Sequence, residues 1–393
     1  MSIQVREFTL KTLMLFPIFT LLAFVPAATT ILSLIGMAGL LYVLIKTGIQ
    51  KSMFFIVVFV SLLTVWNYSI TPEKVINSNE IIYYIYLCIF TAFLVSNRAV
   101  ISNYLVRDIG YIKMICKIWC IIVLVSMVLP SSYSKGVFVS FAVTTFRLSP
   151  SAIFIMSFSS VLIAEEGSQK NLIYTFVPFL SILLGSSRTY LIVGVLMFLL
   201  NLSMVVKKKG VFILTALFLS IAGLIIIINS SMGAKFISSI SEHAYQDPLG
   251  VFTSGRSNFW VKDLNAFMEQ PLSKRFFGCG FNFIRIVNGA IPGTDERGIW
   301  AHNDFIQILI TYGVMGLLLY IVNMRIMFKN LLNSKMPFLI NIAIFMIWFF
   351  NAMFNMYFTY TCSMISLPIA IMAYENYRQK YSTWFGEREV TAE

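Results

Sequence analysis

Long apolar runs separated by short polar stretches recur along nearly the whole chain. Most of these runs have a length of roughly 17–25 residues, which is what a helix needs to cross the hydrocarbon core of a bilayer. The short alternating segments that are typical of a membrane β-barrel are not the pattern here. The sequence therefore predicts an all-α polytopic integral membrane protein with about twelve transmembrane helices. The predicted spans lie near residues 12–26, 29–46, 52–69, 81–97, 112–130, 150–164, 172–186, 189–206, 211–229, 303–325, 337–353 and 360–375.

The longest polar segment covers residues 230–302 and separates the ninth predicted span from the tenth. It divides the chain into an N-terminal group of spans at 1–229, this loop, and a C-terminal group of spans with a short tail at 303–393. The loop contains Trp260 and several phenylalanines, so we expect it to be ordered and functional. Residues 258–268 have helical spacing, and Pro271 and the glycines of 278–280 predict the end of that helix.

Composition and charge support a membrane protein and set its orientation. Hydrophobic residues make up 58% of the chain and charged residues 12%, which is outside the range of soluble domains. The net charge is +12, and most basic residues between spans fall on one side, including the run at 207–209. The positive-inside rule makes that side cytoplasmic and predicts that both termini lie there. The N-terminus resembles a signal peptide, but we interpret it as the first span, and we expect no binding to nucleic acid.

Three arginines lie where the predicted spans meet the opposite, external side of the membrane. Arg147 ends a moderate loop, Arg188 lies between two apolar runs, and Arg256 lies in the long loop. A guanidinium is always charged and presents a planar fork of donors that suits a diphosphate. An interfacial arginine can equally extend to lipid headgroups. We favour that alternative for Arg147 and a functional role for Arg256.

Both histidines of the chain, His243 and His302, fall in the long loop, and His302 stands where the loop re-enters the membrane. A scarce imidazole at such a place is a candidate for proton chemistry. The alternative is structural, because the neighbouring Asn303 is a good N-cap for the tenth span. Asp295 and Glu296 are adjacent rather than spaced to chelate one ion, and no glycine-rich nucleotide loop is present. We therefore expect neither a metal nor another cofactor.

These motifs occur in an order that resembles the O-antigen ligase and polymerase superfamily. Ser187-Arg188-Thr189 begins a span, and Ser254-Gly255-Arg256 precedes Trp260, Pro271 and a Gly278-Cys279-Gly280 turn. His302-Asn303 is followed after nine residues by Gly313, and after two more by Gly316. The resemblance covers roughly residues 185–320.

The resemblance implies a metal-independent glycosyltransferase at the periplasmic face of the bacterial inner membrane, with a saccharide on undecaprenyl diphosphate as donor. Arg188 and Arg256 would bind the diphosphate, and His302 would orient or deprotonate the acceptor hydroxyl, which attacks with inversion. Asn303 and Trp260 would contribute to substrate binding, and Arg147 is a further candidate. These assignments agree with the ordinary chemistry of neutral imidazole and of arginine beside a leaving oxygen.

Two activities of the superfamily fit this description. A polymerase transfers the growing chain to another lipid-linked repeat unit, whereas a ligase transfers the polymer to lipid A–core. We favour the polymerase, which would be expected to work with a flippase and a chain-length regulator of the same pathway, alongside membrane lipid. A flippase for the same lipid is the alternative from another class. It is disfavoured because the spans are almost free of charge and no internal repeat is found.

Overall fold

The protein is built almost entirely from α-helices. The computed structural model describes residues 2–24, 26–71, 78–134, 136–206, 210, 212, 256–289, 298–332 and 338–381. Its helices are α1 (Ser2–Met14), α2 (Phe16–Leu21), α3 (Pro26–Thr47), α4 (Lys51–Ile70), α5 (Ser78–Arg107), α6 (Ile109–Met127), α7 (Thr145–Glu166), α8 (Ile173–Leu184), α9 (Arg188–Val205), α13 (Arg256–Met268), α14 (Leu272–Phe277), α15 (Phe283–Val287), α16 (Asp304–Leu331), α17 (Phe338–Asn355) and α18 (Thr361–Tyr381). Short 3-10 turns are η1 (Pro130–Ser132), η2 (Ser140–Ala142), η3 (Gln169–Leu172) and η4 (Tyr357–Thr359), and β1 (Tyr133–Ser134) pairs antiparallel with β2 (Val137–Phe138).

The prediction of an all-helical polytopic membrane protein is confirmed. Within the described part of the chain, eight helices are long and apolar enough to cross a membrane: α3, α4, α5, α6, α7, α9, α16 and α17. Each of them overlaps one predicted span. Most of the bounds agree to within about five residues, but α5 continues from the non-helical Asn97, where the predicted span ends, to Arg107. The predicted total of twelve stays a prediction, because the ninth span at 211–229 lies almost wholly outside the described residues.

Two predicted spans differ from the helices observed. The first, at 12–26, falls on two helices, because α1 ends at Met14 and α2 begins at Phe16. Pro17 explains the break, since its ring removes one backbone donor and clashes with the carbonyl of the preceding turn. The seventh, at 172–186, corresponds to α8, which has only 12 residues and contains Pro178. The predicted bounds agree with α8 to within two residues, but the helix is shorter than the roughly 17–25 residues expected of a regular span.

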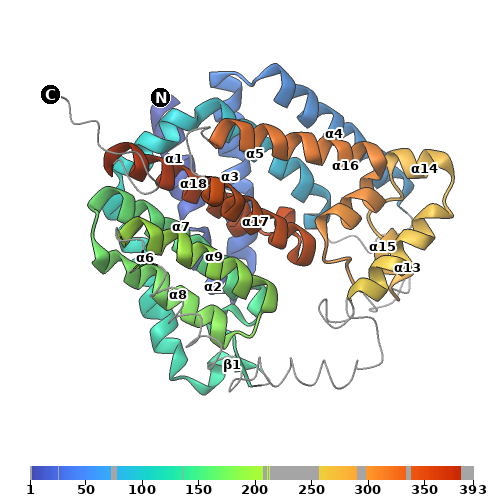
Figure 1. Ribbon diagram of the computed structural model, residues 1–393. Helices are drawn as coiled ribbons and strands as arrows, with labels where there is room; N and C mark the ends of the chain where they lie inside the picture. Colours follow the sequence, from blue (N-terminus) through green and yellow to red (C-terminus); the bar gives the residue numbers. More distant parts are fainter. Residues whose placement is uncertain are drawn as a thin grey trace.

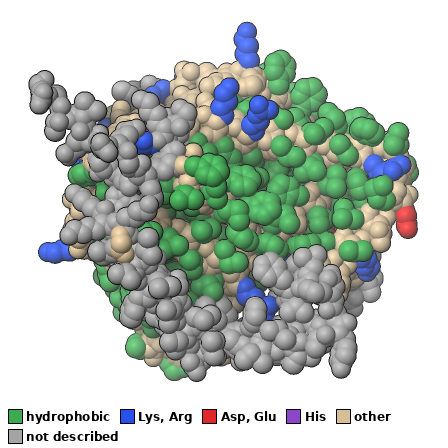
Figure 2. All heavy atoms as spheres, in the orientation of Figure 1, with side chains coloured by type: hydrophobic (Ala, Val, Ile, Leu, Met, Phe, Trp, Pro, Cys, Tyr) green, Lys and Arg blue, Asp and Glu red, His purple; other side chains and the backbone are tan. Residues whose placement is uncertain are grey.

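Helix α7 forms the centre of the bundle. Almost every residue from Leu148 to Ala164 is buried, and α18, α8, α9 and α6 pack around it (Figure 1). Polar side chains also join its neighbours, for example where Asn201 donates to Thr175 at 2.8 Å. Such small polar contacts are a usual means of holding membrane helices together. Helix α4, by contrast, exposes Phe55, Leu62 and Val65. Figure 2 shows a broad hydrophobic field on one face, with lysines and arginines mostly toward its margins.

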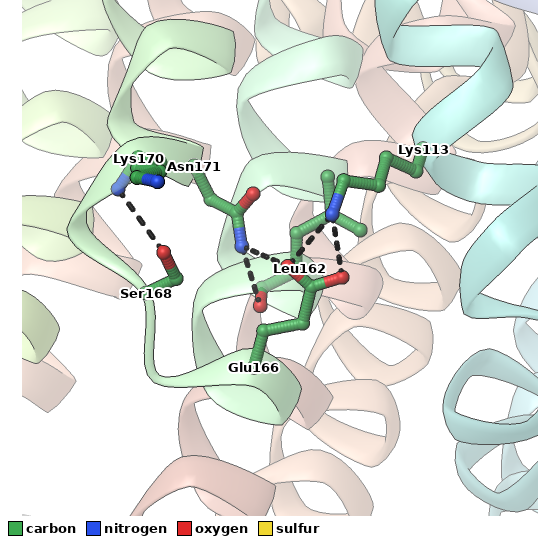
Figure 3. A network of polar contacts seen from close by, with 6 residues as sticks. All are labelled: Lys113, Leu162, Glu166, Ser168, Lys170 and Asn171. Atoms are coloured by element: carbon green, nitrogen blue, oxygen red, sulfur yellow. Dashed lines mark hydrogen bonds and ion pairs between the residues drawn. The ribbon is translucent and has the colours of Figure 1, made fainter.

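Ion pairs gather at one end of the bundle. Lys113 of α6 contacts both carboxylate oxygens of Glu166 at 2.8 Å, and Glu166 also accepts from Asn171 at 3.0 Å (Figure 3). Lys380 of α18 pairs with the adjacent Glu165. Helix α7 runs from Arg147 to this end, a rise of roughly 28 Å at 1.5 Å per residue. That length is close to the thickness of a hydrocarbon core, so Arg147 and these ion pairs mark opposite membrane faces.

The described part of the long loop folds into α13, α14 and α15, which lie beside the start of α16 (Figure 1). Its turn is joined to two transmembrane helices. The amide of Asn67 in α4 donates to the Phe277 carbonyl at 2.8 Å, and its oxygen accepts from Gly280 N at 3.0 Å. Gly313 has φ 72° and kinks α16, and a Cβ there would lie 2.2 Å from the Phe276 carbonyl oxygen. The glycines of the sequence motif therefore allow the loop backbone to contact the kink.

Candidate functional site

His302 directly precedes the N-cap of α16 and has an unusual backbone conformation. His302 has φ 51°, a region that residues with a side chain rarely occupy. The next residue, Asn303, is the N-cap of α16, and its side-chain oxygen accepts from Ile306 N at 3.1 Å. The imidazole stacks on Phe146 of α7, with ring centroids 6.0 Å apart and planes 20° from parallel. The cap and the stacked ring together fix where the imidazole lies.

Helix α13 holds this segment from the loop side. Trp260 is only 8% exposed, and its indole N–H donates to the carbonyl of Ala301 at 2.6 Å. Its ring also packs against Phe354 near the end of α17, with centroids 6.1 Å apart. The carbonyl that Trp260 binds directly precedes His302. This hydrogen bond thus joins α13 to the backbone immediately before His302.

Three arginines from three different elements converge on the same place. Arg256 begins α13 and donates to the Phe354 carbonyl at the end of α17. Arg188 begins α9 and interacts electrostatically with Arg256. Arg147, in the first turn of α7, interacts with Tyr360, which in turn interacts with Arg256. Cations that face one another across a small space repel, and a bound anion relieves that repulsion.

The electrostatics of the cluster keep the histidine neutral. Burial lowers the pKa of His302 to about 4, and the positive charge of Arg256 contributes to the shift. Burial also lowers the pKa of Arg256, with the charge of Arg188 acting in the same direction and Tyr360 opposing it. A guanidinium nevertheless remains protonated in proteins. The site therefore combines fixed positive charges with an unprotonated imidazole.

A cavity of about 430 Å³ adjoins the arginine cluster. Arg147, Pro150, Thr359 and Tyr360 line it at the cluster, and Phe16, Leu34, Met37 and Ile82 are among its apolar wall residues from α2, α3 and α5. The cavity thus joins a cationic end to an apolar body. This combination suits a ligand with an anionic head and a hydrocarbon chain.

The predicted site residues meet in the structure to different degrees. Arg147, Arg188, Arg256 and His302 belong to one cluster, linked pairwise by the contacts given above. The interfacial interpretation that we favoured for Arg147 stays a prediction. Asn303 acts as a helix cap, and its amide points to the Met353 sulfur at 3.7 Å.

Part of the predicted motif falls on residues outside those that the structure describes. Ser254, Gly255 and His243, together with Asp295 and Glu296, lie outside the described residues. Within the residues that the structure does describe, no group of three or more His, Cys, Asp or Glu side chains could hold a metal ion.

Three residues of the site were missed by sequence reasoning. The Phe146 ring stacks on His302, Tyr360 interacts electrostatically with Arg147 and Arg256, and Asn67 forms hydrogen bonds with the turn after α14. Phe146 could have been noticed from its position beside Arg147. Tyr360 and Asn67 carry no local signal, because each meets the site only through tertiary packing of a distant helix.

Comparison with known proteins gives one family. Residues 173–321 match the family model described as O-Antigen ligase. This segment runs from α8 to beyond the Gly313 kink of α16, and it includes Arg188, Arg256 and His302. No curated protein matches the chain. The chain is thus a multi-pass membrane protein by its apolar helices, and residues 173–321 are similar to the O-antigen ligase family, whose members are glycosyltransferase-like enzymes of polysaccharide assembly.

Proposed function

We propose that the protein is an O-antigen polymerase, a membrane glycosyltransferase that joins oligosaccharide repeat units carried on undecaprenyl diphosphate. The observation that carries the proposal is the cluster of Arg147, Arg188, Arg256 and His302, of which Arg147 also lines the cavity. The cluster lies on the membrane face opposite the ion pairs of α6, α7 and α18, and we assign it to the periplasmic face of the inner membrane. The cavity offers its apolar wall to the lipid and its cationic end to the diphosphate.

The proposed reaction is a single inverting displacement that needs no metal ion. The acceptor hydroxyl oxygen attacks the anomeric carbon of the donor sugar, and the bond from that carbon to the phosphate oxygen breaks. The electron pair leaves with undecaprenyl diphosphate, and its charge is stabilised by Arg188 and Arg256. The proton of the acceptor hydroxyl passes to the neutral imidazole of His302.

Supporting residues hold this arrangement. Trp260 keeps the backbone before His302 in place through its hydrogen bond to Ala301, and Asn303 caps the following helix. We assign both a positioning role that is compatible with the predicted contact to substrate. Arg147 lies at the junction with the cavity, where it would contact the phosphate next to the lipid.

An O-antigen ligase is the second candidate, and the description of the matching family favours it. A ligase would use the same arginines for the same lipid diphosphate but would take the sugar of lipid A–core as acceptor. We place the polymerase first because the resemblance is confined to the segment that both enzymes share, and polymerase sequences vary with their sugar repeat.

The test is a reaction with purified protein and the lipid-linked repeat unit extracted from cells that lack the gene. The polymerase lengthens this lipid-linked saccharide without added lipid A–core, and chelation of divalent cations with EDTA leaves the rate unchanged. Arg256→Ala and His302→Ala lose the activity, whereas Lys262→Ala, an exposed change on the same helix, retains it. Product that forms only on lipid A–core would identify the ligase, and no product with either acceptor would refute both.

A further inference from the structure

We propose that Tyr360 is a further substrate-binding residue, whose hydroxyl donates a hydrogen bond to the lipid-linked diphosphate where the arginine cluster meets the cavity. The inference rests on the proposed function and adds a residue to the same site. Tyr360 lies 58 residues beyond His302, outside the segment that matches the family model.

The backbone around Tyr360 is fixed by local hydrogen bonds. Tyr360 follows η4 and directly precedes α18, and its carbonyl accepts from Met364 N at 3.0 Å in the first turn of that helix. Before it, Met356 has φ 63°, and the Thr359 hydroxyl donates to the Met356 carbonyl at 2.8 Å. A side chain on so short and constrained a connection has a defined direction.

The side chain of Tyr360 is directed toward the cavity and toward the arginine cluster. Tyr360 lines the 430 Å³ cavity together with Arg147 and Tyr83. It also interacts electrostatically with Arg256, which begins a different element on the loop side. Tyr360 therefore lines the cavity beside Arg147 and interacts with both Arg147 and Arg256.

The chemistry of a phenol fits an anion at this junction. Guanidinium groups are donors only, so Arg147 and Arg256 can each donate to the Tyr360 oxygen but cannot accept its proton. An ordinary phenol has a pKa of about 10 and carries its proton at neutral pH. The O–H is then available to an acceptor that both arginines also attract, and a phosphate oxygen is such an acceptor. Tyr360 adds a donor without adding a third charge beside the two arginines.

The contribution of this bond is largest when the leaving group gains charge. A hydrogen bond to a charged group is lost when the donor is removed, and such losses correspond to a decrease of about ten- to hundredfold in binding or rate. Tyr360→Phe keeps the ring and removes only the hydroxyl. Tyr360→Gln removes the ring but keeps a donor.

The experiment compares purified Tyr360→Phe, Tyr360→Gln and Arg256→Ala with the wild type. Tyr377→Phe is the matched control, because it removes a hydroxyl from α18 near the end of the helix that lies opposite Tyr360. Farnesyl diphosphate serves as the probe for a lipid diphosphate, and its dissociation constant is measured beside that of phosphatidylglycerol in mixed micelles. The polymerisation rate is measured on the extracted repeat unit.

We expect Tyr360→Phe to weaken farnesyl diphosphate binding and to lower the polymerisation rate, each by about ten- to hundredfold. Its binding of phosphatidylglycerol should be unchanged. Tyr377→Phe should behave like the wild type, and Tyr360→Gln should give intermediate values. Equal losses for both lipids would reassign Tyr360 to phospholipid headgroups and overturn the proposal. Wild-type values for Tyr360→Phe beside a defective Arg256→Ala would overturn it while leaving the proposed function intact. Normal activity in Arg256→Ala would refute the proposed function itself. Should Tyr360→Phe not fold, Tyr360→Gln decides, since loss of diphosphate binding equal to that of Arg256→Ala excludes a donor role.

Discussion

The protonation of His302 offers a prediction that can be measured without knowing the sugar. Burial and the charge of Arg256 lower its pKa from an ordinary value of 6.5 to about 4. This difference corresponds to about 3 kcal/mol against the imidazolium in the folded protein. At pH 5 about nine-tenths of the His302 side chains are then neutral, compared with a few per cent for an ordinary histidine. We therefore expect the activity to persist well below pH 6.

The perturbation is Arg256→Gln, which removes the charge and retains a side chain of similar length. The pKa of His302 should rise, but it should stay below 6.5, because burial is the larger cause of the shift and remains. Binding of a lipid diphosphate to the wild type should also raise the pKa of His302, because the anion offsets the charge of Arg256. Such a rise would bring the imidazole toward the pKa at which a general base works best near neutral pH.

The assay is an NMR titration of protein labelled at histidine. The chain has two histidines, so His243→Asn leaves the signal of His302 alone. The titration is run on the free protein, with farnesyl diphosphate, and in the Arg256→Gln background. A His302 pKa near 6.5 in the free protein, unchanged by Arg256→Gln, would refute the reasoning about burial and charge at this site.

The same shift makes stability depend on pH, with a defined sign. In the unfolded chain His302 takes up a proton near pH 6.5, whereas in the folded protein it does so only near pH 4. The unfolded state therefore binds more protons between these values, and acid favours unfolding. The stabilisation is complete above pH 6.5 and is lost progressively toward pH 4. The Arg256→Gln variant should lose less stability over this interval, as thermal unfolding at each pH can show.

Three further predictions concern the supports of the site. Gly313→Ala should destabilise the protein by several kcal/mol, because its methyl group would lie 2.2 Å from a carbonyl of α14, whereas Gly110→Ala, with open space around it, should change the unfolding temperature little. Trp260→Phe leaves the buried carbonyl of Ala301 without its donor, so we expect a loss of about 1–3 kcal/mol in unfolding experiments and a decreased rate. Asn67→Ala removes two hydrogen bonds to the loop turn, and faster proteolysis of the loop than in wild type is the expected result; equal rates would contradict it.

Much of the fold could be predicted from the sequence because bilayer thickness fixes the length of an apolar helix. The length of the apolar run at 52–69 was enough to predict a span there, and α4 occupies Lys51–Ile70. The first span failed because one proline, Pro17, ends a helix inside an apolar run. An average of hydropathy over many residues is little affected by one proline, so it locates the apolar segment but not the point at which the helix is interrupted.

The site was predictable where chemistry and position coincide. Arg188, Arg256 and His302 each begin or precede a helix, and such scarce residues next to apolar runs are visible in the sequence. The part played by Tyr360 could not be predicted from the sequence, because tyrosines are common wherever an apolar run meets a membrane interface. Only the packing of α18 against α7 brings it close enough to interact with both Arg147 and Arg256.

The roles of the motif glycines also depended on tertiary structure. Gly313 was attributed to close helix contact, and the structure shows a more specific reason. Its positive φ kinks α16, and the missing side chain admits the backbone of α14. A pattern of spacing cannot reveal which backbone segment approaches from elsewhere in the chain.

The most direct test of the account is a gel of surface lipopolysaccharide from a strain that lacks the gene and carries either the wild-type protein or Arg256→Ala. Lys262→Ala serves as the control, and protein levels in the membrane are matched. The account predicts that the wild type and the control restore the ladder, while Arg256→Ala leaves core with a single repeat unit. A full ladder with Arg256→Ala would contradict the central claim, and bare core with accumulating lipid-linked polymer would replace the polymerase with the ligase.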